Sequence, residues 1–254
     1  MYFVNSKMLI ISNNIQINHT DPEYLKIKNS ISVLNFAYLE KASIQLKHSL
    51  ANPNFTPPIS KHKALFSIYN KLIKEHQIMF LLFNIFENSL RSKAAISITE
   101  HFSSNNSDDW WKDISMLDKN LLAPVQSAIT QLHKNGISIP TIDTFDIFDT
   151  FTFGQLEHIY NNYWSILKDI FNSTTFNGNT FPNLTQIQFK DKISKIRNAR
   201  NDISHHKPIN YTGNTTRRSL IRDVELLMNY MKFNLKDALN NIDNQQDIIP
   251  HLLY

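Results

Sequence analysis

The 254-residue sequence contains no cysteine and only four glycines. The absence of cysteine excludes disulfides, thiolate zinc sites and cysteine nucleophiles. Glycine normally makes up about 7% of a protein and is the residue that most easily adopts positive φ. Its scarcity argues against a turn-rich β-sandwich and against nucleotide folds built on glycine-rich loops. The sequence also lacks the run of roughly 18 apolar residues that a membrane-spanning helix requires.

Hydrophobic residues account for 42% of the chain and charged residues for 19%, which excludes a disordered or fibrous protein. The N-terminal stretch is apolar, but it has neither the basic region nor the small-residue cleavage site of a signal peptide. We therefore expect an all-α, cytoplasmic protein without a membrane partner, in which residues 1–254 form a single domain.

Apolar residues recur at helical spacing along most of the chain. The predicted helices cover residues 21–50, 61–101, 108–116, 121–134, 153–171, 184–206 and 215–240. The second of these is longer than a typical globular helix, so we expect a bend or break in it. Residues 137–152 are predicted to form an ordered loop rather than a short strand pair, and residues 172–183 a second loop, while the tail from Asn241 is predicted to be loose.

Positive charge is concentrated in one segment, residues 186–207. This window holds six Lys and Arg against two Asp, an excess that equals the net charge of +4 of the whole chain. Such a concentration favours a polyanionic partner, and RNA is the partner we expect. The predicted RNA-binding residues are Lys192, Lys195, Arg197 and Lys207.

The same segment carries the candidate catalytic residues Arg200, Asn201 and His205. Asn201 and His205 are four apart and share a helix face, while Arg200 lies about 140° from His205 around the helix. One helix does not surround a small substrate with these side chains, but two copies facing each other across a symmetric contact do. The spacing therefore favours a homodimer.

The residue types indicate phosphodiester chemistry. Histidine can accept or donate a proton near neutral pH, which suits His205 to general acid–base catalysis. The guanidinium of Arg200 matches the oxygens of a phosphate, and Asn201 can orient an imidazole or a ribose hydroxyl. RNA supplies its own nucleophile, the 2′-hydroxyl. The prediction is an endoribonuclease without metal or cofactor that leaves a cyclic phosphate.

These residues resemble the R-x(4–6)-H signature of HEPN ribonucleases, and the flanking sequence resembles the Abi-like (abortive infection) branch. Residues 85–92 are similar to that branch's "IE-x-x-LR-[ST]" helix, with Phe86 where Ile is usual. Residues 151–156 are similar to its "T-x-G-x-L" element, and residues 196–206 to its "L-R-x-x-RN-x-x-x-HH" helix. The resemblance covers about residues 25–240 in family order, leaving loose N- and C-terminal tails.

The resemblance implies a HEPN-like helical bundle with additional helices and long loops, and a dimer with paired motifs. It also implies phage defence or toxin-like RNA cleavage, often restrained by an antitoxin RNA or protein. Glu87 and Arg91 would support catalysis, with Glu87 orienting Arg200 or His205 from a neighbouring helix. The alternative for Glu87 and Arg91 is a simple surface ion pair one helical turn apart. His206 is expected to be a flanking or backbone-capping residue rather than a second catalyst.

Two other functions remain open. The basic helix could clamp RNA without cutting it, or the chain could be a catalytically silent helical dimerisation module. Residues 145–149 contain carboxylates, but no histidine lies at ligand spacing, so we expect no metal site there.

Overall fold

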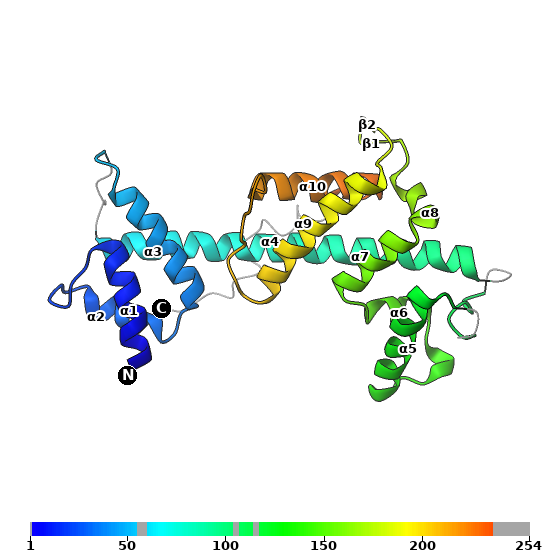
Figure 1. The fold of residues 1–254 in the computed structure, drawn as a ribbon, viewed down its shortest axis with the longest axis horizontal. Coiled ribbons are helices and arrows are strands. Elements are labelled where there is room, and N and C mark those ends of the chain that lie inside the picture. Colours follow the sequence, from blue (N-terminus) through cyan, green and yellow to red (C-terminus); the bar gives the residue numbers. More distant parts are fainter. Residues whose placement is uncertain (1, 55–59, 104–106, 114–116, 236–254) are drawn as a thin grey trace, which may run out of the picture. The chain divides into compact units, whose positions relative to one another are not determined.

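The computed structural model describes residues 2–54, 60–103, 107–113 and 117–235 (Figure 1). The chain is mostly helical, which confirms the all-α prediction at the level of fold class. In the described part, each helix is too short or too polar to cross a bilayer. The chain forms two compact units: unit 1 comprises the residues up to Leu82 and Ala199–Asn210, and unit 2 comprises Phe83–Asn198 and the described residues from Tyr211 onward. A single domain spanning the chain stays a prediction.

Unit 1 contains three helices and the first part of a long fourth one. Their bounds are α1 Tyr2–Ile15, α2 Tyr24–Ile31, α3 Phe36–Leu50 and α4 Lys61–Phe102. Helix α1 packs against α2 and α3. Its Met8, Ile11 and Ile15, spaced by three and four residues, are completely buried. The predicted loose N-terminal tail is therefore wrong for residues 2–15, although the spacing of these residues was a helical signal.

The single helix predicted over residues 21–50 is wrong, because the chain leaves the helix between α2 and α3. Asn35 adopts an extended backbone, and its side-chain oxygen accepts hydrogen bonds from the backbone N–H groups of Ala37 and Tyr38. This is an N-cap, which satisfies amides that a continuous helix would pair with carbonyls of the preceding turn. The apolar stripe continues across the break, so periodicity alone does not reveal it.

Unit 2 contains the rest of α4 and most of the remaining elements. The first group is α5 Lys119–Lys134, the 3₁₀ turn η2 Ile139–Thr141, α6 Thr144–Asp149, α7 Phe153–Asn162, α8 Trp164–Leu167 and the 3₁₀ turn η3 Lys168–Phe171. The second group is β1 Thr174–Phe176, β2 Asn179–Phe181, α9 Gln186–Ser204, whose last turns belong to unit 1, and α10 Arg217–Tyr230. Aromatic rings fill the core of this unit: Phe189 lies 4.8 Å from Phe171 and 5.2 Å from Tyr160 between ring centroids.

Two predicted loops of unit 2 contain regular structure. Residues 137–152 hold α6, which begins with a capping box between Asp143 and Asp146. The aspartates that suggested a loop are thus a helix-start signal. Residues 172–183 form an antiparallel hairpin that turns at Asn177 and Gly178, both with positive φ. An Asn-Gly pair between short β-prone segments is the usual sequence of such a turn.

Other helix predictions differ in their ends. The long helix α4 runs from Lys61 to Phe102 without the predicted break, and the predicted helix over 153–171 is divided at Tyr163. The helix predicted over 108–116 is wrong for residues 108–113, which form turns and bends, while 114–116 lie outside the described residues. Helix α10 stops at Tyr230 rather than at 240, because Lys232 takes a left-handed conformation. The loose tail predicted from Asn241 also lies outside the described residues. The predictions for α5 and α9 are confirmed within two residues at each end.

Replacing Asn35 with alanine should lower the free energy of unfolding by about 1 kcal/mol, the usual value of an N-cap. The variant loses the cap of α3 and also a hydrogen bond that the Asn35 amide donates to the carbonyl of His206, 3.0 Å away. Urea unfolding measures the change. Asn35→Ser is the matched control, since serine is an equally good N-cap and its short side chain loses the amide donor to His206. Equal losses in the two variants would show that the cap of α3 contributes nothing.

Candidate active site at the end of helix α9

The predicted catalytic residues all lie in the last turns of α9 or directly after it, within unit 1. Arg200 is half-buried, whereas Asn201 and His205 are exposed. The backbone N–H of His205 donates a hydrogen bond to the carbonyl of Asn201, 3.1 Å away, so His205 still follows the helical spiral. The arrangement agrees with the predicted spacing, with Asn201 and His205 one turn apart.

Helix α9 ends in a Schellman motif centred on His206. The N–H of Lys207 donates to the carbonyl of Asp202 at 2.8 Å, and that of His206 donates to the carbonyl of Ile203 at 2.9 Å. His206 occupies the left-handed position with φ of +52°. Glycine usually fills this position, and a residue with a Cβ adopts it at a cost of about 1 kcal/mol. The expectation that His206 takes part in capping the helix thus agrees with its backbone position.

One face of α3 fixes the backbone that follows the motif. Three polar side chains at intervals of three residues each donate a hydrogen bond to a carbonyl of this segment. The bonds run from Asn35 to His206 at 3.0 Å, from Tyr38 to Lys207 at 2.8 Å, and from Lys41 to Ile209 at 3.1 Å. The chain beyond α9 is therefore held by α3 as well as by its own helix cap.

Burial shifts the pKa of two of these donors, Tyr38 and Lys41. Burial, followed by the negative charges of Glu75 and Asp202, raises the pKa of Tyr38 to about 12. The phenol is thus a neutral donor throughout the physiological range. Burial lowers the pKa of Lys41, and the same two carboxylates oppose that effect. The three donors of α3 to these carbonyls are therefore two neutral groups, Asn35 and Tyr38, and one lysine, Lys41.

His76 of α4 is a site residue that the sequence reasoning missed. Its Nδ1 lies 2.5 Å from the Tyr38 hydroxyl, and its ring centroid lies 5.9 Å from that of His206. Burial and then the neighbouring His206 lower the pKa of His76. The available signal was the missing apolar residue at position 76 within the helical stripe of α4, where a polar residue needs a partner.

Three of the four predicted RNA-binding cations form ion pairs within unit 2. Lys192 pairs with Asp223 of α10, Lys195 with Asp191 one turn earlier on α9, and Arg197 with the buried Glu157 of α7. The Arg197–Glu157 and Lys192–Asp223 pairs join separate helices, so these two cations also contribute to packing. The fourth cation, Lys207, is exposed in unit 1.

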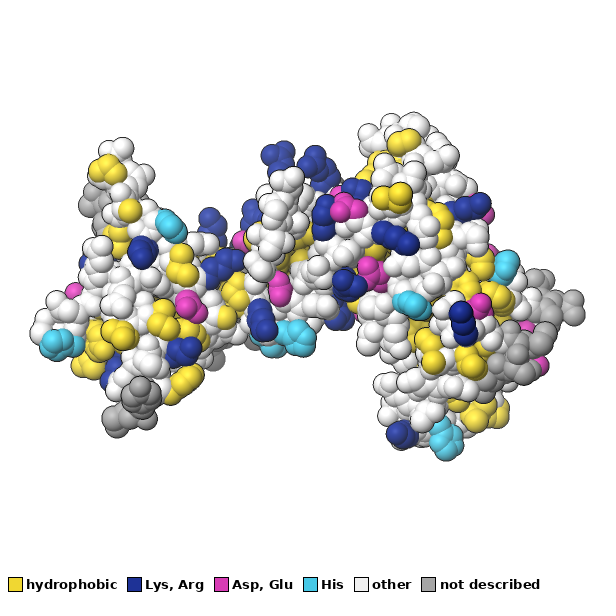
Figure 2. All heavy atoms as spheres, viewed as in Figure 1, with side chains coloured by type: hydrophobic (Ala, Val, Ile, Leu, Met, Phe, Trp, Pro, Cys, Tyr) yellow, Lys and Arg dark blue, Asp and Glu magenta, His cyan; other side chains and the backbone are white. Residues whose placement is uncertain are grey.

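A further group of cations lies on α10, also in unit 2. Arg217, Arg218 and Arg222 are exposed on its first turns, and Figure 2 shows Lys and Arg side chains gathered over α10 and the adjoining part of α9. The sequence carried a signal for this surface, since Arg218 and Arg222 are four residues apart on one helix face.

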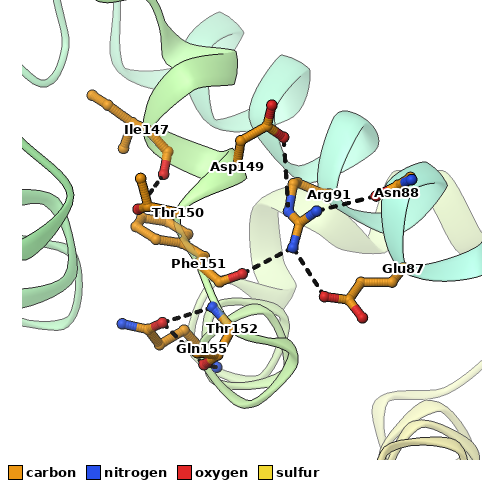
Figure 3. A network of polar contacts seen from close by, with 9 residues as sticks. All are labelled: Glu87, Asn88, Arg91, Ile147, Asp149, Thr150, Phe151, Thr152 and Gln155. Atoms are coloured by element: carbon orange, nitrogen blue, oxygen red, sulfur yellow. Dashed lines mark hydrogen bonds and ion pairs between the residues drawn. The ribbon is translucent and has the colours of Figure 1, made fainter. Parts of the chain in front are cut away.

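Glu87 and Arg91 form a buried ion pair in unit 2 (Figure 3). Only 13% of the Arg91 side chain and 7% of the Glu87 side chain is exposed, and the two groups are 2.9 Å apart. Arg91 also donates a hydrogen bond to the carbonyl of Phe151, 2.9 Å away. The alternative of a simple surface pair is therefore wrong. That Glu87 orients Arg200 or His205 stays a prediction, because those residues belong to unit 1.

The contact of Arg91 with Phe151 joins two of the segments that carry the family resemblance. Phe151 immediately precedes Thr152, which caps α7 through a capping box with Gln155. Arg91 thus fastens the start of α7 to α4. The residues of these two segments have a structural role in unit 2, whichever further role they play.

Among the described residues, no group of three or more His, Asp or Glu side chains is placed to hold a metal ion. Comparison of the chain with known protein families, with curated proteins and with solved structures finds no match. The functional assignment therefore depends on the residues and their geometry.

Arg91→Met should lower the free energy of unfolding by about 3 kcal/mol, because it leaves the buried Glu87 carboxylate and the Phe151 carbonyl without this donor. Lys195→Met is the matched control: it removes another i, i+4 pair, but with side chains that are 41% and 59% exposed. An exposed pair of this kind contributes about 0.2–1 kcal/mol at most. Urea unfolding of both variants measures the difference, and equal losses would contradict a structural role for Arg91.

The lowered pKa of His76 predicts that stability declines below neutral pH. The unfolded chain has the ordinary histidine pKa and binds a proton first as the pH falls through about 6.5, so the stability present above that pH is then lost. We expect the urea midpoint to fall less between pH 7.5 and pH 5.5 in His76→Gln than in the wild type. His158→Gln, at an exposed histidine on α7, should behave like the wild type. The same decline in all three proteins would contradict the prediction.

Proposed function

We propose that the protein is a metal-independent endoribonuclease in which Arg200, Asn201 and His205 act on the phosphodiester. The observation that supports this most directly is the exposed histidine at the end of α9, next to an arginine and an asparagine, on a backbone held by α3. A fixed backbone favours catalysis because small displacements of reacting groups are costly.

The chemistry needs no group beyond RNA and side chains. The 2′-oxygen attacks phosphorus while an imidazole takes the proton of the hydroxyl. The bond from phosphorus to the 5′-oxygen breaks, and a second imidazole gives that oxygen a proton. Arg200 stabilises the negative charge that develops on the phosphate oxygens, and Asn201 orients a reacting group. The products are a 2′,3′-cyclic phosphate and a free 5′-hydroxyl.

The proposal extends to assembly and biology through the resemblance to Abi-like HEPN ribonucleases. In a homodimer, each protomer contributes one motif to a shared site, and Glu87 and Arg91 support it. The proposal also includes a HEPN-like bundle and a cytoplasmic location. It further includes a role in phage defence or as a toxin, and restraint by an antitoxin RNA or protein. Lys207 and the arginines of α10 are the exposed cations that favour RNA binding.

Incubation of the protein with end-labelled single-stranded RNA in EDTA should yield fragments with cyclic-phosphate ends. His205→Ala should reduce the rate by about 10²–10⁴, the usual contribution of a general acid or base. His158→Ala, which removes an exposed histidine far from the motif in sequence, is the matched control and should cut like the wild type.

Each other outcome identifies a different function. Equal cleavage by the wild type and His205→Ala would show that His205 is not the catalyst. Binding without cleavage, with an affinity that falls steeply with salt, would identify an RNA clamp. Absence of both binding and cleavage would leave the helical dimerisation module.

A further inference from the structure

Three rings from separate segments of unit 1 meet beside the motif. Tyr38 comes from α3, His76 from α4, and His206 from the turn after α9. The Tyr38 hydroxyl lies 2.5 Å from Nδ1 of His76, and the rings of His76 and His206 are stacked, with planes inclined by 29°. His206 is exposed at the end of this series, whereas Tyr38 is buried.

The hydrogen bonds determine the tautomer of His76. The phenol of Tyr38 has one hydrogen, and it donates that hydrogen to the carbonyl of Lys207. Its oxygen is then an acceptor toward His76, so Nδ1 of His76 carries a hydrogen and donates it. Neutral His76 consequently has its lone pair on Nε2. Tyr38 thus fixes both the backbone after His206 and the orientation of the ring that contacts His206.

The left-handed backbone of His206 is not by itself a functional feature. Gln16 after α1 and Lys232 after α10 also take positive φ at the ends of their helices, as expected in a chain with so few glycines. What distinguishes His206 is its ring, which stacks on His76. Gln16 therefore provides a natural comparison, since it shares the backbone position and lacks the imidazole.

Contrary to the expectation from the sequence, we propose that His206 is the second acid–base group of the ribonuclease and that His76 and Tyr38 are positioning residues for it. This inference rests on the proposed function. Cleavage by the 2′-hydroxyl requires one proton to be taken and another to be given, and the second transfer then falls to His206 of the same protomer rather than to the second His205 of the dimer. The consecutive His205 and His206 supply both: one takes the proton of the 2′-hydroxyl while the other protonates the departing 5′-oxygen.

The charged groups around His76 and His206 affect how readily these two rings carry a proton. Burial and then the positive charge of His206 lower the pKa of His76. The other titratable groups around the cluster are Tyr38, Tyr69, Lys41, Glu75 and Asp202. Glu75 and Asp202 both act on Lys41 and Tyr38, and the single positive charge of Lys41 offsets one of their two negative charges.

The test is the pH dependence of RNA cleavage in EDTA for wild type, His206→Gly and Gln16→Gly. Both substitutions place glycine at a left-handed position, so neither should lower the melting temperature. His206→Gly should reduce cleavage by about 10²–10⁴ and remove one limb of the bell-shaped pH profile, while His205→Ala removes the opposite limb. Gln16→Gly should cut like the wild type. His206→Asn, which also tolerates positive φ, should reproduce the loss.

His76→Gln and Tyr38→Phe test the positioning roles. In both, the limb that disappears in His206→Gly should shift along the pH axis, with KM unchanged. If the wild type cuts and His206→Gly cuts equally well with the same profile, the inference is overturned and the ribonuclease proposal stands. If the wild type does not cut at all, the ribonuclease proposal fails and this inference fails with it.

Discussion

Hydrogen bonds from one face of α3 to the backbone carbonyls beyond α9 are the interaction on which the candidate site depends. Asn35, Tyr38 and Lys41 hold consecutive parts of a segment that a helix cap alone would leave exposed to solvent. The carbonyls at a helix end lack intrahelical partners, so donors from another helix both satisfy them and fix the direction of the chain. His205 and His206 lie at this point, and the exposed imidazoles therefore start from an ordered backbone.

Polar contacts between helices also stabilise unit 2. Arg91 on α4 reaches the carbonyl of Phe151 at the start of α7 and at the same time pairs with Glu87. Arg197 on α9 and Glu157 on α7 form a second link between helices. In both units, charged or phenolic side chains bind the ends of neighbouring helices. Buried polar groups of this kind are costly unless paired, so they specify which helix ends meet.

The success of the sequence reasoning varied with the range of the interaction involved. Helix α9 and the cap of α7 at Thr152 were predictable, because each depends on residues within a few positions of one another. The division between α2 and α3 was missed, since an apolar stripe continued across it. The hairpin at Asn177 was missed although its turn sequence is typical, because its strands are only three residues long and too short to show the two-residue period of a strand.

The sequence by itself determined the helical class, the scarcity of positions suited to positive φ, and the placement of Arg200, Asn201 and His205 near one helix end. Those properties follow from composition and from the 3.6-residue period. Only the tertiary structure decided that Tyr38 and His76, 38 residues apart, lie beside His206, and that Arg91 is buried against Phe151. Contacts between segments far apart in the chain depend on how whole helices pack, and local sequence carries almost no record of that packing.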